Sequence, residues 1–141
     1  MDKNQEADCL FCKIISQEVP AEIVWSNDNW LAFLDIHPIN PGHTLLVPKS
    51  HFKNFFTLPE NLLSEIGPLA SNLGQTITKA VKADGFNLGI NNDPAAGQII
   101  FHTHIHLMPR FDNDNHKHWS GQEQTPEELQ QTAKLIKQHL S

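Results

Sequence analysis

The stretch His102-Thr103-His104-Ile105-His106 decides the fold of this chain, because its residue types alternate with the period of a β-strand. In a strand, alternate side chains leave the same face of the sheet and lie about 6–7 Å apart. The three histidines therefore share one face, while Thr103 and Ile105 take the opposite face, where we expect the core. Three groups that titrate near neutral pH on one face of a strand predict a chemical site there.

Short apolar runs separated by turn-forming residues predict a sheet around this stretch. The expected strands occupy residues 22–26, 30–35, 43–47, 86–91 and 100–108. Between the last two strands, residues 91–98 form a loop that is rich in turn formers. Strands joined by short turns, with helices between and after them, favour antiparallel pairing.

A long helical pattern covers residues 59–83, where apolar residues recur every three or four positions. Gly67-Pro68 lies inside it and predicts a kink or a break, and Asp84-Gly85 closes the helix. A shorter helix is expected over residues 12–19. The stretch Thr125-Pro126-Glu127-Glu128 combines an N-cap, a proline at the first helical position and a capping-box glutamate, so a further helix starts there.

These elements predict a single α+β domain with a mainly antiparallel five-stranded sheet, one long helix and a C-terminal helix. We expect a flexible leader over residues 1–8, the folded domain over residues 9–110 and a C-terminal extension over residues 111–141. The helix of the extension is expected to pack on the same domain through an apolar stripe. That stripe consists of Leu129, Ala133, Ile136 and Leu140.

The composition excludes some classes of partner. The chain has 141 residues and a net charge of −6 with neutral histidines, and it contains no basic run of the kind that binds nucleic acid. No stretch is long and apolar enough for a signal peptide or a membrane span, so we expect a cytoplasmic protein without a membrane partner.

Two chemical readings of the three histidines compete. In one, they chelate a catalytic zinc ion that activates water. In the other, a neutral imidazole attacks phosphorus and forms a covalent intermediate, while neighbouring groups position the phosphate.

Cys9 and Cys12 add a C-x-x-C spacing, which in a cytosolic chain suggests metal or redox chemistry. His116, His118 and Trp119 follow in a polar segment that we interpret as a solvated loop.

The segment His102–Met108 resembles the H-φ-H-φ-H-φ-φ signature of the histidine-triad (HIT) nucleotide hydrolases and transferases, in a zinc-containing bacterial-type subgroup. Further motifs stand in the order found in that family, and the resemblance covers roughly residues 9–110. Those motifs occupy residues 9–15, 31–36, 41–43, 47–51 and 96–98.

The resemblance implies a catalytic triad of His102, His104 and His106. A purine nucleotide, containing AMP or GMP, would bind with its α-phosphate at the triad. His104 would become nucleotidylated, His106 would contact the α-phosphate, and Asp35 would accept hydrogen bonds from the ribose hydroxyls. His43 would lie beside the triad. The apolar slot for the base would be formed by Phe11, Ile14, Val19, Phe33 and Ile36, and the phosphate would be surrounded by Asn91, Gly97 and Gln98.

The resemblance also implies a structural zinc ion and a homodimer. The zinc ligands would be Cys9, Cys12, His51 and His102, and no organic cofactor is expected. Two thiolates and two imidazoles close a tetrahedron with no open position. The dimer would form through the long helix and a strand edge.

Residue 99 departs from the pattern of the family. Ile99 stands where relatives usually carry Ser or Thr, so one hydrogen bond to the phosphate or the leaving group is missing. We expect slower turnover or a different leaving group. Asn91 favours a nucleoside phosphoramidase over a dinucleoside polyphosphate hydrolase. A nucleotide-binding regulatory module with weak catalysis is the alternative that Ile99 favours.

Overall fold

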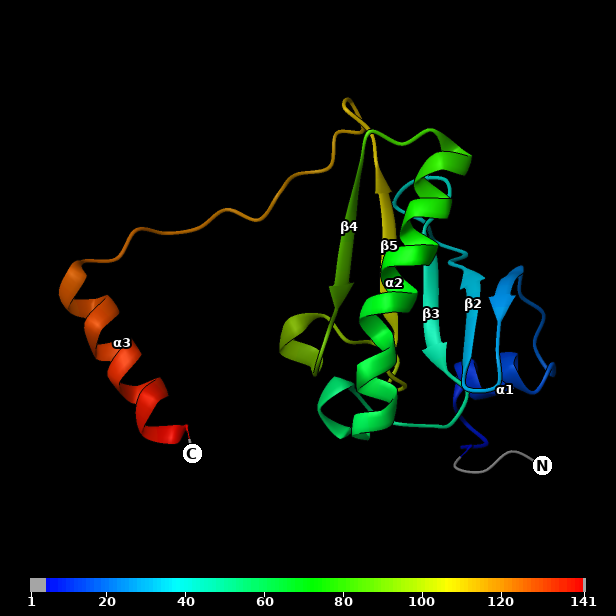
Figure 1. The fold of residues 1–141 in the computed structure, drawn as a ribbon, viewed down its shortest axis with the longest axis horizontal. Helices are drawn as coiled ribbons and strands as arrows, with labels where there is room; N and C mark the ends of the chain where they lie inside the picture. The colour runs from blue at the N-terminus through cyan, green and yellow to red at the C-terminus, as the bar shows by residue number, and fades with distance from the viewer. Residues whose placement is uncertain (1–4, 141) are drawn as a thin grey trace.

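The computed structural model describes residues 5–140 and contains a five-stranded antiparallel sheet with the strand order β1-β2-β3-β5-β4 (Figure 1). The strands are β1 (Ile23–Ser26), β2 (Trp30–Leu34), β3 (Thr44–Pro48), β4 (Gly85–Ile90) and β5 (Ile105–Arg110). The helices are α1 (Leu10–Ile15), α2 (Glu60–Val81) and α3 (Pro126–His139), with 3₁₀ turns at η1 (Phe55–Thr57) and η2 (Pro94–Ala96). The predicted α+β class, the antiparallel sheet, the long helix and the C-terminal helix are confirmed.

The sheet is buried on both faces because successive residues of its central strands enter different cores. On β2, Trp30 packs towards α2 and Phe33 packs towards α1. On β3, Leu46 joins the α2 side, whereas Val47 joins the α1 side. For this reason the sequences of β2 and β3 are almost continuously apolar, instead of alternating between apolar and polar residues. The sheet therefore has an α2 face and an α1 face.

The strand that carries the histidines begins later than predicted, at Ile105 rather than at residue 100. Before it, the backbone N–H and the hydroxyl of Thr103 both donate to the carbonyl of Phe52, at 2.7 and 2.9 Å. The segment is therefore held by a loop and not by a neighbouring strand. The predicted core side is confirmed, since Thr103, Ile105 and Leu107 are buried.

The predicted break of the long helix at Gly67-Pro68 is wrong, since α2 runs without interruption from Glu60 to Val81. Both residues are exposed, so water can satisfy the carbonyl that the proline leaves without a donor. The helix also ends earlier than predicted. Lys82 takes the left-handed conformation at φ 56° and caps the helix, while Gly85 already begins β4.

The short N-terminal helix starts at Leu10 rather than at residue 12. The reason is Cys9, whose sulfur accepts a hydrogen bond from the backbone N–H of Cys12 at 3.4 Å and caps the first turn. Residues 5–8, part of the predicted leader, lie before this helix and outside any strand. Residues 1–4 of that leader lie outside the described residues.

The capping box of α3 is confirmed, with Thr125 and Glu128 as its two members. The prediction that this helix packs on the same domain is wrong. Every residue of α3 is exposed, and residues 111–125 carry the helix away from the sheet on the side of β4 (Figure 1). Among residues 5–140, no helix combines the length and the apolar character that crossing a membrane requires.

Candidate active site and metal centre

The three histidines lie on the α1 face of the sheet, opposite α2. His106 is on β5 and pairs with Leu45 of β3, while His102 and His104 stand in the extended segment before β5. The ring centroids of His104 and His106 are 5.0 Å apart. Phe11 of α1 packs its ring edge-on against His104 at 5.1 Å. The predicted shared face is thus formed, with α1 covering part of it.

The hydrogen bond of His104 fixes which of its ring nitrogens is free. Its Nδ1 lies 2.8 Å from the carbonyl oxygen of His102, and only an N–H can donate to a carbonyl. In the neutral ring the lone pair is therefore on Nε2. Burial lowers the pKa of His104 below its ordinary value, so the ring is neutral at neutral pH. This is the form in which an imidazole is nucleophilic.

His43 lies beside the triad, as the family resemblance implied, and a hydrogen bond from His43 orients His106. The backbone N–H of Ile39 donates to Nδ1 of His43 at 3.1 Å, so the proton of the neutral His43 ring is on Nε2. That Nε2 lies 2.9 Å from Nδ1 of His106 and donates to it. The proton of His106 is therefore on its own Nε2. The relay turns His106 into a hydrogen-bond donor at the atom farthest from His43.

The relay requires neutral rings, and the site provides them. Burial, together with the neighbouring rings of His104 and His43, lowers the pKa of His106 to about 4. Burial also lowers the pKa of His43, although Asp35 opposes this from 3.6 Å. Near pH 7 both residues are therefore uncharged.

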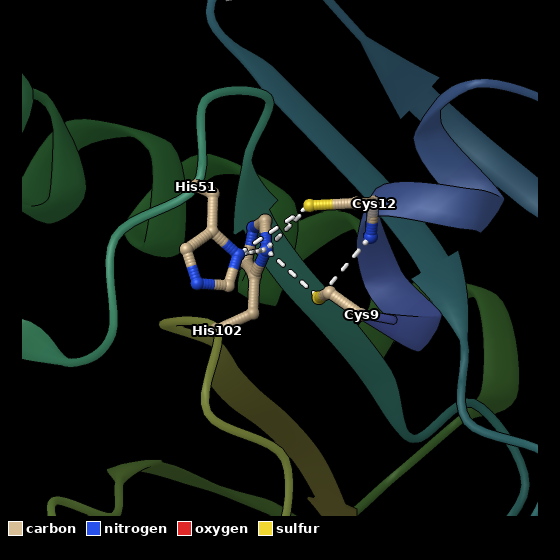
Figure 2. A group of neighbouring side chains, drawn as sticks. All are labelled: Cys9, Cys12, His51 and His102. Carbon is tan, nitrogen blue, oxygen red and sulfur yellow. Dashed lines mark hydrogen bonds between the residues drawn. The ribbon is translucent and has the colours of Figure 1, made fainter. Parts of the chain in front are cut away.

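His102 has a different environment, because it faces two cysteines and a fourth side chain (Figure 2). Its Nε2 donates to the carbonyl of Pro48 at 2.8 Å, which leaves the lone pair on Nδ1. Nδ1 lies 3.5 Å from the sulfur of Cys9 and 3.6 Å from that of Cys12. Nδ1 of His51 lies 3.4 Å from the sulfur of Cys12 and 3.2 Å from Nδ1 of His102. The predicted set of four ligand residues is thus brought together.

The donor set fits zinc in number, type and spacing. In a tetrahedral zinc site, sulfur and nitrogen ligands lie about 3.5–3.6 Å apart and two nitrogen ligands about 3.3 Å apart. The four distances above match these values to about 0.2 Å, well within the tolerance of side-chain adjustment. Cys9 and Cys12 are free thiols. Burial raises the pKa of Cys12 to about 11, so a bound cation would have to displace its proton.

A second group, made of Asp35, His43 and His106, also brings its ligand atoms within 4.8 Å of one another. It is poorly suited to a metal ion, because a ligating imidazole donates its other N–H, whereas Nδ1 of His43 accepts from Ile39. Over residues 5–140, neither group of this kind contains all three triad histidines. The hypothesis of a catalytic zinc held by the triad therefore lacks the geometry that it needs.

The loop before the triad is only partly as predicted. Asn91 and Gly97 lie together, since a Cβ at Gly97 would come within 3.4 Å of Nδ2 of Asn91, and Gly97 has a positive φ of 93°. Gln98 instead faces the interior, where its Oε1 accepts from the N–H of Asp93 and its Nε2 donates to the carbonyls of Lys53 and Ile100. Its amide therefore braces the loop from within, and the place of Gln98 near a phosphate stays a prediction.

The residues predicted for the base slot divide into two groups. Phe11, Ile14 and Phe33 are buried in the core on the α1 face, and Val19 packs against them. Ile36 does not join them, because it is 79% exposed. A groove of about 390 Å³ lies beside Ile14 and Val19. The structure thus brings four of the five residues together, and a contact of Ile36 with the base stays a prediction.

Sequence reasoning missed a clamp that holds the loop between Asp35 and His43. Nε and Nη2 of Arg110 donate to Asp114 at 2.8 and 3.1 Å, and Asn40 donates to the same carboxylate at 2.9 Å. The hydrogen bond from Arg110 holds the pKa of Asp114 far below its usual range. His116 donates to the carbonyl of Ile39 at 2.7 Å. Since no motif marks these residues, only the tertiary contacts reveal them.

Comparison with known proteins identifies the family. The HIT domain matches residues 16–113. An adenylylsulfatase of Arabidopsis thaliana is 41% identical over 107 residues, which are 76% of this chain and 54% of that protein. An adenosine 5′-monophosphoramidase of Saccharomyces cerevisiae is 38% identical over 107 residues, 76% of this chain and 65% of that protein.

Two solved structures are also similar. A crystal structure from Streptococcus mutans UA159 has a TM-score of 0.91 at 35% identity and covers 98% of this chain and 88% of its own. A zinc-bound histidine triad family protein from Mycobacterium smegmatis has a TM-score of 0.74 at 32% identity and covers 82% of this chain and 84% of its own. This chain belongs to the HIT family of nucleotide-binding hydrolases and transferases.

Proposed function

We propose that this protein cleaves nucleoside phosphoramidates, or related nucleotide conjugates, at the α-phosphate through a covalent nucleotidyl-His104 intermediate. The observation that carries the proposal is the hydrogen bond from Nδ1 of His104 to the carbonyl of His102, which leaves Nε2 with the lone pair. The similarity to a monophosphoramidase supports the choice of substrate class.

The neighbouring groups suit the two steps of such a reaction. In the first, Nε2 of His104 forms a bond to phosphorus, the bond from phosphorus to the leaving nitrogen breaks, and that nitrogen takes up a proton and departs as an amine. The carbonyl of His102 stabilises the positive charge that develops on the ring. Nε2–H of His106 donates to a non-bridging phosphate oxygen. In the second step, the oxygen of water forms a bond to phosphorus, the bond from phosphorus to Nε2 of His104 breaks, and the water loses a proton to solvent, so that the nucleoside monophosphate leaves.

The rest of the nucleotide would lie along the α1 face. We propose that Asp35, which is half-buried beside His43, accepts the ribose hydroxyls, and that Asn91 and the backbone at Gly97 contact the phosphate. The preferred base would be a purine. We also propose a cytoplasmic homodimer that forms through α2 and the edge of β4, since β4 pairs on only one side.

We further propose a structural zinc ion bound by Cys9, Cys12, His51 and His102, which the spacing of the donor atoms and the zinc-bound relative support. When bound, zinc would cross-link the N-terminal segment to the segment that carries the triad, with no open position for a substrate. His102 would then act as a ligand. Its backbone carbonyl would continue to orient His104.

The test is a quenched reaction of the purified chain with adenosine and guanosine phosphoramidates and with dinucleoside polyphosphates, followed by mass spectrometry of the intact protein. We expect an added mass of one nucleoside monophosphate, localised to His104, and its disappearance with time. The matched variant His118→Ala, a change of an exposed histidine, should keep the adduct. Turnover at the wild-type rate by His104→Gln would refute the proposal.

The second candidate is a nucleotide-binding regulatory module with weak catalysis. Ile99 favours it, because its side chain is 85% exposed and offers no hydrogen-bond donor to a phosphate. Such a module would bind AMP and would form no adduct with any of the substrates in the screen. The same experiment therefore separates the two candidates.

A further inference from the structure

The loop between β2 and β3 carries the group that decides the direction of the histidine relay. The backbone N–H of Ile39 donates to Nδ1 of His43, which places the proton of the neutral ring on Nε2. Asp35 favours the same tautomer, but its carboxylate lies 3.6 Å from Nε2 of His43, beyond the range of a good hydrogen bond. The position of one backbone N–H therefore determines which way His43 and His106 share their protons.

The relay has a second arrangement that would serve a phosphate poorly. If the N–H of Ile39 moved away, the proton of His43 would be free to occupy Nδ1, and Nε2 of His43 would become an acceptor. The proton of His106 would then lie on its Nδ1, and its Nε2 would face the phosphate with a lone pair. Both arrangements keep the 2.9 Å hydrogen bond between the two rings, so the rings alone do not select one of them.

Ile39 is held from the segment that follows β5. Nε2 of His116, 77 positions further along the chain, donates to the carbonyl of Ile39 at 2.7 Å. The side chain of the next residue, Asn40, donates to Asp114 at 2.9 Å. The loop between β2 and β3 and the segment after β5 lie at the same end of the sheet (Figure 1). The chain is thus fixed directly after the N–H that orients His43.

Asp114 joins these contacts into one unit with the catalytic strand. Its side chain is only 6% exposed, and its Oδ1 accepts from the backbone N–H of His116 at 3.0 Å. Arg110 donates to the same carboxylate and belongs to β5, the strand that carries His106. The loop that orients His43 is thereby fastened to the strand that carries the other ring of the relay.

We propose that His116 is a positioning residue, which acts through Ile39 and His43 to keep a proton on Nε2 of His106. The effect on the rate rests on the proposed function, because it requires His106 to donate to the phosphate. The effect on the tautomer does not, because it is present in the protein without substrate. His116 itself needs no contact with the nucleotide.

Three variants separate the hydrogen bond of His116 from the bulk of its side chain. His116→Ala removes the donor, and water that replaces it satisfies the carbonyl of Ile39 without tying it to the linker. His116→Gln keeps a donor, since its amide nitrogen takes the place of Nε2. His118→Ala changes another exposed histidine of the same segment and is the matched control.

The first readout is the single-turnover rate on adenosine phosphoramidate. It should fall about three- to tenfold in His116→Ala, as expected for the loss of one neutral hydrogen bond. It should stay at the wild-type value in His116→Gln and His118→Ala. An unchanged rate in His116→Ala, or an equal loss in His118→Ala, would overturn the proposal.

A double variant tests the route through His43. In a chain that already carries His43→Ala, adding His116→Ala should change the rate by less than about twofold, because the connection to His106 is already cut. If the two losses multiplied, His116 would act by another route, and the proposal would be overturned.

Long-range ¹⁵N spectra of the substrate-free protein show where the protons of the relay lie. In His116→Ala, a second tautomer of His43 and His106 should appear at about a tenth of the population or more, and His116→Gln should suppress it. An unchanged tautomer in His116→Ala would overturn the positioning role and leave the proposed function intact. A changed tautomer in a protein that forms no nucleotidyl adduct would support the positioning role and refute the proposed function.

Discussion

The five-residue stretch from His102 to His106 contributes to two groups of imidazoles, and the two groups are suited to opposite tasks. His102 and His51 turn Nδ1 towards the sulfurs of Cys9 and Cys12. His104 and His106 have no thiol nearby, and backbone groups or a further histidine hold one nitrogen of each ring. The ligand atoms of the first group surround a common centre, as a metal site requires. In the second group, Nε2 of His104 is free to accept or attack, and Nε2–H of His106 is free to donate. The partner of the other ring nitrogen thus decides what each histidine can do.

The largest expected effect is on the rate of the chemical step, which should depend on the second group of imidazoles and not on the first. His104→Gly removes the nucleophile, and we expect the single-turnover rate on adenosine phosphoramidate to fall by about four orders of magnitude or more. Cys12→Ser changes the other group and should leave the rate per folded molecule within about tenfold, since no thiol takes part in the proposed chemistry. Rapid-quench measurements on both variants check this. A comparable loss in both would show that the groups act as one site.

The second effect concerns stability. If Cys9, Cys12, His51 and His102 bind zinc, protein purified without chelator should contain close to one zinc per chain. Cys9→Ser should lose the metal and about 3 kcal/mol of unfolding free energy, which is typical of a lost structural ligand. The melting temperature should then fall by about 6–12 °C. Elemental analysis and calorimetry provide the readouts. Less than about 0.2 zinc per wild-type chain, with both thiols free, would refute the metal site.

Features that depend on neighbours in the sequence could be predicted from the sequence alone. The alternation at Thr103, Ile105 and Leu107 predicted the core side correctly, because burial follows the period of the backbone. The capping box at Thr125 was predicted correctly because its hydrogen bonds are local. These features depend on residues that are close in sequence.

Predictions failed where the partner that decides the local structure is far along the chain. Gln98 is held by Lys53, a residue 45 positions away, and no local pattern distinguishes such a brace from a phosphate ligand. The clamp between Asn40 and Asp114 spans 74 positions. The start of β5 depends on Phe52, which takes the hydrogen bonds of Thr103. The packing of α3 cannot be read from the stripe alone, because an apolar stripe does not specify which surface covers it.

The third effect tests the relay within the second group. His43→Ala removes the donor to Nδ1 of His106, which frees the proton of His106 to occupy either nitrogen. We expect the chemical rate to fall about 10–100-fold, the equivalent of about 1–3 kcal/mol for one oriented hydrogen bond. The exposed His37→Ala is the matched control and should leave the rate unchanged. Long-range ¹⁵N spectra should show a change of the His106 tautomer in His43→Ala, and an unchanged tautomer would contradict the relay.

The fourth effect is the pH profile of the chemical step. Burial lowers the pKa of His106 to about 4 and also lowers the pKa of His104 and His43, so the three rings should be neutral at pH 6.5 and above. The single-turnover rate should therefore be nearly flat from pH 8 to pH 6.5 and fall at lower pH, where His104 and then His106 take up a proton. A rate that rises steadily from pH 7 to pH 5 would contradict a neutral nucleophile.

The same shift makes a prediction for stability. The unfolded chain takes up a proton on His106 near pH 6.5, whereas the folded chain does so only near pH 4. The unfolded state thus binds more protons between these values, and the free energy of unfolding should fall as the pH drops from 6.5 to 4. In His106→Asn that part of the fall should disappear. Urea unfolding at pH 6.5, 5.5 and 4.5 measures the difference.

The smallest effect concerns Ile99, which lies between Gln98 and the triad in the sequence. A charge-assisted hydrogen bond from a serine at this position is worth up to about 1.5–3 kcal/mol. Because the side chain is 85% exposed, water competes for the same phosphate oxygen, and the gain in Ile99→Ser should be less than about tenfold in rate. Ile99→Val is the matched control, since it removes apolar bulk without adding a donor. Equal rates for the serine and valine variants would mean that the missing hydroxyl does not limit turnover and that the second group of imidazoles is sufficient by itself.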